Sequence, residues 1–96
     1  MNIREAIEEI IKEVNSGAIF DSHFVISQLI KKRSDVYLNF AKTLEPSESS
    51  TITLHQRIAK EIGKLVASKM IDRMDYKSYS ENIHGNNSEC QAWKKH

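Results

Sequence analysis

Residues 53–70, TLHQRIAKEIGKLVASKM, carry the strongest secondary-structure signal in the chain. Their apolar residues recur at steps of three and four, which is the period of an α-helix: Leu54, Ile58, Ile62, Leu65, Val66 and Met70. At about 100° per residue, Arg57, Lys60 and Lys64 fall together on the opposite face. The pattern predicts one continuous helix over 53–70 with a core face and a basic face.

The start and the length of this helix follow from simple rules. Thr53 with Gln56 three residues later matches a capping box, so the helix is expected to begin at Thr53. Its length of about 27 Å spans most of a 96-residue domain, whose radius of gyration is roughly 12 Å. The basic face therefore has to meet solvent or a partner. Gly63 lies near the border of the two faces, where we expect a neighbour to pack closely.

Three further helices are predicted upstream. Residues 2–15 have a narrow apolar stripe behind Asn2 as the cap, and residues 22–32 follow two candidate caps, Asp21 and Ser22. Ser34 can cap a third helix over 35–44. Residues 18–20 are too short to classify and fit either a short strand or a buried connector. Residues 45–50, EPSESS, are predicted to be a surface loop.

The segment 71–96 has a different character. Residues 73–78 alternate in a way that allows a strand, and residues 80–87 are polar and read as a loop. Ser88 and Gln91 form a second capping-box pattern, which favours a short helix over 89–95, while a return strand over 90–94 is the alternative. We therefore predict a mainly α, four-helix domain whose irregular C-terminal extension holds a short β-ribbon or a short fifth helix.

Composition limits the class of protein. Ninety-six residues make a single domain over 1–96, and one cysteine excludes an internal disulfide framework. The first residues are too acidic for a signal peptide, and no apolar run approaches the length of a membrane span. These features predict a cytoplasmic protein without a membrane segment. A domain this small buries a modest fraction of its surface, so we expect a homodimer at even odds.

Charge is unevenly distributed although the net charge is only +1. Residues 1–21 hold five acids and two bases, and residues 22–96 hold twelve bases and eight acids. A polyanion would therefore approach the side away from the first helix. The candidate cations are the basic face of residues 53–70 and the cluster Lys31, Lys32 and Arg33. For each set, the ordinary alternative is a solvated helix face, or, for the cluster, cations at a helix C-terminus.

Nothing in the sequence predicts catalysis, a cofactor or a metal site. His84, Cys90 and His96 stand six residues apart, wider than zinc-chelating pairs usually are. Asp21, Ser22 and His23 are consecutive, so their side chains diverge and cannot form a hydrolytic triad. We expect a non-enzymatic protein. We expect Cys90 to be a small buried thiol.

Two functional hypotheses remain. The first is a protein-interaction domain, an adaptor, inhibitor or accessory protein that binds another protein or itself. Its contacts would come from the helix over 53–70 and from the aromatic residues Tyr76 and Tyr79. The second is a nucleic-acid-binding regulator, because helices followed by a strand, a polar loop and a strand resemble a winged-helix layout. In that reading the helix over 53–70 reads the duplex and residues 80–87 form the wing.

Overall fold

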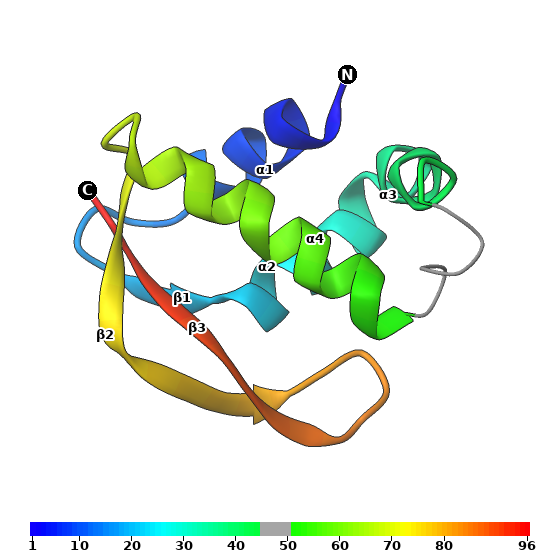
Figure 1. Cartoon of the computed structure of the whole chain (residues 1–96). Helices are drawn as coiled ribbons and strands as arrows, with labels where there is room; N and C mark the ends of the chain where they lie inside the picture. The colour runs from blue at the N-terminus through cyan, green and yellow to red at the C-terminus, as the bar shows by residue number, and fades with distance from the viewer. Residues whose placement is uncertain (45–50) are drawn as a thin grey trace.

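The computed structural model describes residues 1–44 and 51–96. Within these residues four α-helices pack together, and a three-stranded antiparallel sheet curves along one side of them (Figure 1). The domain is therefore α+β, and the prediction of a mainly α, four-helix domain is wrong. The predicted loop over 45–50 lies outside the described residues.

The first three helices lie close to where the sequence placed them. They are α1 (Ile3–Lys12), α2 (Ser22–Lys32) and α3 (Ser34–Ala41). In α1 the side chain of Asn2 accepts from the backbone N–H of Glu5, and the Glu5 side chain accepts from that of Asn2. Asp21, rather than Ser22, caps α2. Ser34 does not act as a cap, because α3 already begins there.

The fourth helix, α4 (Thr51–Gly63), is shorter than the predicted 53–70. It begins before Thr53, so the expected capping box does not set its start. After Gly63 the backbone tightens into a single 3₁₀ turn, η2 (Lys64–Val66), without a break in direction at Gly63. The reversal comes at Lys69, whose φ is +63°. The backbone N–H groups of Lys69 and Met70 donate to the carbonyls of Val66 and Leu65, which closes the helical segment, and the buried Ile71 then begins a strand.

The sheet contains β1 (Ile19–Asp21), β2 (Ile71–Glu81) and β3 (Asn87–Lys95), with β3 in the middle. The short helix expected over 89–95 is wrong, since these residues belong to β3. Of the two readings of residues 18–20, the strand is confirmed. The predicted loop over 80–87 is too long, because only residues 82–86 connect β2 to β3.

A bulge interrupts the pairing of β2 with β3. The register advances by four residues on β2, from Arg73 to Lys77, while it advances by two on β3, from Trp93 to Gln91. Trp93 and Gln91 lie two residues apart on β3 and so share one face, and Arg73 and Lys77, which pair with them, lie on that face too. The bulge therefore brings two cations of β2 to the face on which Gln91 lies.

The core forms where this hairpin meets the helices. Trp93 of β3 is 1% exposed, and its indole N–H donates to the hydroxyl of buried Ser22 at 3.0 Å. The core face of α4 is confirmed, because Leu54, Ile58 and Ile62 are all buried. None of the helices in the described residues is long and apolar enough to cross a lipid bilayer.

Candidate functional site

A groove of about 420 Å³ separates α4 from the β2–β3 hairpin. In Figure 1 α4 runs diagonally across the front of the molecule, and the hairpin curls beneath it. Side chains of α2, α4, β2 and β3 line the groove. Two separate parts of the chain thus line one open groove, which makes this groove the leading candidate for a binding site.

Cations from both walls face this groove. Lys60 comes from α4, and Arg73 and Lys77 come from β2. Among the described residues, none of these three forms an ion pair. Glu89 is the one acid lining the groove in the described part of the chain. The groove therefore has an excess of positive charge, and this charge is available to an anion.

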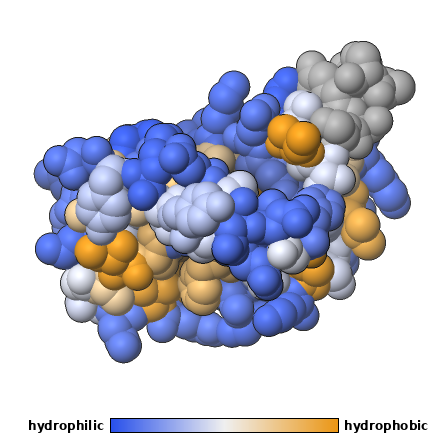
Figure 2. Space-filling view, turned by 90° about the horizontal axis from the view of Figure 1, so that it is seen from below, coloured by the Kyte–Doolittle hydropathy of each residue, from blue (hydrophilic) through white to orange (hydrophobic). Residues whose placement is uncertain are grey.

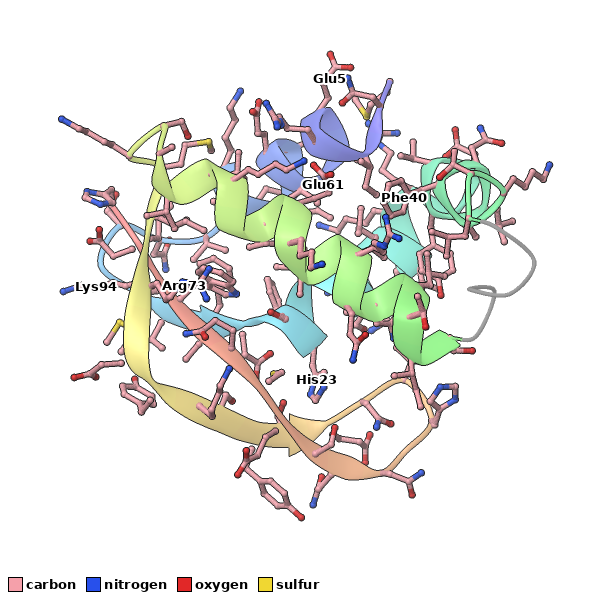
Figure 3. The ribbon with its side chains drawn as sticks, in the orientation of Figure 1. Glu5, His23, Phe40, Glu61, Arg73 and Lys94 are labelled. Carbon is pink, nitrogen blue, oxygen red and sulfur yellow. The ribbon has the colours of Figure 1, made fainter. Side chains whose placement is uncertain are left out.

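Arg73 is held in place by its neighbours. Its guanidinium carbon lies 4.9 Å from the centroid of the Trp93 ring. A Cβ on Gly63 would come 3.1 Å from Nη2 of Arg73, so the side chain passes directly over this glycine of α4. Close packing was predicted at Gly63, and in the structure Arg73 and Trp93 provide it. In Figure 3 the Arg73 label lies under α4, whereas Lys94 points away from the helices.

The structure divides the predicted basic face of residues 53–70. Only Lys60 reaches the groove beside the hairpin. Arg57 and Lys64 line a separate hollow of about 410 Å³ between α3 and α4, which Lys60 also borders. Lys64 donates to Glu61 at 2.9 Å, and Glu61 also lines that hollow. The charge of the predicted basic face is therefore partly neutralised by Glu61 of the same helical segment.

The predicted cluster at the end of α2 serves mainly to join helices. Lys32 pairs with Glu13 at 2.6 Å, and Arg33 makes two hydrogen bonds to the carboxylate of Glu9. The hydrogen bonding that Arg33 donates to Glu9 raises the pKa of Arg33. Lys31 alone faces elsewhere, toward the hairpin connection.

A polar network supports the groove from the N-terminus of α2. The carboxylate of Asp21 accepts from the hydroxyls of Ser78 and Ser80 at 2.7 and 2.8 Å and from the N–H of Phe24. Burial acts to raise the pKa of Asp21, but these hydrogen bonds and nearby His23 together lower it. Asp21 therefore stays ionised and fixes α2 against β2.

His23 completes this network. Because the Ser80 hydroxyl donates to Asp21, it can only accept from His23, so Nδ1 of His23 carries the proton and lies 2.8 Å from Ser80 Oγ. Ser88 lies 3.4 Å from the other ring nitrogen. Of the three consecutive residues, Asp21 and His23 both bond to Ser80, whereas the Ser22 hydroxyl accepts from Trp93.

A second histidine joins α4 to both α3 and the hairpin connection. Nε2 of His55 lies 2.9 Å from the Tyr37 hydroxyl, and its ring stacks on His84 with centroids 6.5 Å apart. Burial lowers the pKa of His55, and His84 and His23 add to the effect. The hairpin connection is thereby held against α4.

The groove offers no evident reactive group. Cys90 is half-buried, and burial raises the pKa of its thiol. In the described residues, no group of three or more His, Cys, Asp or Glu side chains is arranged to hold a metal ion. His96, one of the three residues weighed as zinc ligands, lies 2.9 Å from Asp72 instead.

Neither of the two predicted tyrosines lines the groove. Tyr76 is 48% exposed and borders a hollow on the β1 side, and Tyr79 is 70% exposed. Sequence reasoning missed Arg73 and Lys77, because simple alternation places Asp75 between them as a neutralising neighbour. Because of the bulge, Asp75 does not lie between the two cations on the groove side, and it does not line the groove.

The chain matches no protein-family model, no curated protein and no solved structure.

Proposed function

We propose that the protein binds duplex nucleic acid, with α4 presented to the duplex and a phosphate backbone lying in the groove between α4 and the hairpin. The observation that carries this proposal is the convergence of Lys60, Arg73 and Lys77 from two elements on one open groove without ion-pair partners among the described residues. Phosphate contacts of this kind supply most of the affinity of proteins for nucleic acid.

The layout of the elements supports the same function. The element order α1, β1, α2, α3, α4, β2, β3 and the strand order β1-β3-β2 resemble those of winged-helix domains, with one additional helix. In such domains one helix is presented to the major groove and the hairpin flanks it. The likeness is one of layout, and the functional argument depends on the site.

The distribution of charge sets the direction of approach. Glu5 of acidic α1 and His23 of the groove lie on opposite sides of α4 in Figure 3. Two other acids of the first segment, Glu9 and Glu13, are paired with Arg33 and Lys32. A polyanion is therefore attracted to the groove side and repelled from the α1 side.

Salt dependence tests this function. Fluorescence anisotropy with a labelled generic duplex, measured between about 50 and 200 mM salt, should show log affinity falling linearly with log salt concentration. Lys60→Gln should make that slope shallower by about 0.9, the value for one phosphate contact. Lys12→Gln on α1 is the matched control and should leave the slope unchanged. Absence of binding at 50 mM salt would overturn the proposal.

A second candidate, self-association, is favoured by a different surface. Ile19, Phe24 and Tyr76 are 54%, 40% and 48% exposed around a hollow of about 640 Å³ beside the edge strand β1. Figure 2 shows hydrophobic surface gathered on the left of the underside, the side on which β1 and β2 lie. Identical edge strands can pair antiparallel about a two-fold axis, so the proposed occupant is a second copy of the chain.

A further inference from the structure

Arg73 and Lys77 share one acceptor, and that acceptor is uncharged. Nη1 of Arg73 lies 3.4 Å from Oε1 of Gln91, and Nζ of Lys77 lies 3.3 Å from the same oxygen. Charge-assisted hydrogen bonds are usually about 2.7–2.9 Å long, so both contacts are loose. Two positive charges therefore converge on one point where only a partial negative charge meets them.

The Gln91 side chain is fixed by the bulge in β2. Its Nε2 donates to the carbonyl of Met74 at 2.8 Å and to the carbonyl of Ala92 at 3.0 Å. Both amide hydrogens are thus used, and the oxygen has to face the cations. The bulge, which leaves the carbonyl of Met74 available, therefore orients the amide that gathers Arg73 and Lys77.

The two cations keep unused donors on the groove side. A guanidinium has five N–H donors and an ammonium has three, and the contacts with Gln91 use one of each. Arg73 has little freedom to move away, since it lies between Trp93 and Gly63. A planar guanidinium beside a flexible ammonium fits the oxygens of a phosphate group.

We infer that Arg73 and Lys77, gathered by Gln91 at the bulge in β2, form a seat for a phosphate group. This inference rests on the proposed function for the source of that group, which is one phosphate of the duplex backbone entering the groove. A phosphate oxygen accepts from both cations more strongly than the neutral amide does, because it carries a full negative charge. The seat lies across the groove from Lys60, so it positions the hairpin on the backbone.

The test separates the seat from general charge. In the anisotropy assay, Lys77→Gln should make the salt slope shallower by about 0.9, and Arg73→Gln should do the same. Lys77→Arg keeps the charge and should keep the wild-type slope. Lys94→Gln is the matched control, because it removes one charge from the same sheet at a side chain that points away from the groove (Figure 3). Circular dichroism confirms that each variant is folded.

A direct probe makes the seat testable without a duplex. Titration of the protein with inorganic phosphate, against sodium chloride at equal ionic strength, should shift the NMR signals of the Arg73 Nε–H and the Gln91 side-chain amide, and Lys77→Gln should abolish these shifts. If no duplex binds but phosphate still shifts these signals, the proposed function fails and the seat stands. If the duplex binds while Lys77→Gln and Lys94→Gln give equal slopes and phosphate shifts nothing, the seat is overturned.

Discussion

His55 is a single residue that links three parts of the fold, and its burial has a consequence for pH. Its pKa is lowered from an ordinary value of 6.5, chiefly by burial. The unfolded chain therefore binds the proton more readily than the folded protein does. The contribution of neutral His55 to the free energy of unfolding is therefore fully present above about pH 6.5, and it is lost as the pH falls below that value.

We predict that the free energy of unfolding of His55→Gln falls less than that of the wild type between pH 7.5 and pH 5.5. Glutamine does not titrate, yet its amide can still bond to the Tyr37 hydroxyl. Urea denaturation at both pH values measures the two decreases. Equal decreases would show that folding does not disfavour protonation of His55.

Of the three cations that line the groove, only Lys60 is among the candidates named from the sequence. Helical periodicity identified it, because side-chain direction in a helix depends on local spacing alone. Arg73 and Lys77 could not be found in this way. Their direction depends on a bulge, and the bulge depends on how β2 pairs with a strand that follows later in the chain.

Among the elements, the first three helices were predicted closely, whereas the helix over residues 53–70 was drawn too long and a helix was favoured where β3 lies. The bounds of α2 match the predicted 22–32, since its apolar spacing and its cap are local signals. The capping-box pattern of Ser88 and Gln91 is equally local, but these residues pair as strand with residues of β2, and the hydrogen bonds of the sheet prevail. The residues around Ser88 do not indicate that this segment pairs with β2.

The turn between η2 and β2 contains the one described non-glycine residue with a positive φ, Lys69. This left-handed conformation costs an L-residue about 1 kcal/mol, and glycine adopts it without that cost. We predict that Lys69→Gly raises the free energy of unfolding by about 0.5–1 kcal/mol. Urea denaturation measures the change.

A residue two positions before Lys69 provides the control. Ala67 has φ −63° and ψ −31°, the ordinary right-handed conformation. Ala67→Gly should therefore lower the free energy of unfolding by roughly 0.5–1 kcal/mol. If both variants lose stability, the conformation of Lys69 is not a source of strain.

For the molecule as a whole, the apolar surface beside β1 predicts an oligomeric state. Light scattering coupled to size exclusion should show a dimer, and Ile19→Lys should convert it to a monomer because a charge enters the contact. Leu38→Lys on α3 is the matched control, since Leu38 is 56% exposed and lies on another element. A wild-type chain that is monomeric at all concentrations would remove the second candidate function.

The central position of β3 also shapes how the chain reaches its fold. The middle strand is the last element in the sequence, and it pairs Lys94 with Ile19 across most of the chain length. The β2–β3 hairpin needs only a short connection, whereas the pairing of β1 with β3 closes a very long loop and carries a larger entropy cost. We therefore expect the pairing of β1 with β3 to form late in refolding, and the fluorescence of Trp93 on β3 can report it.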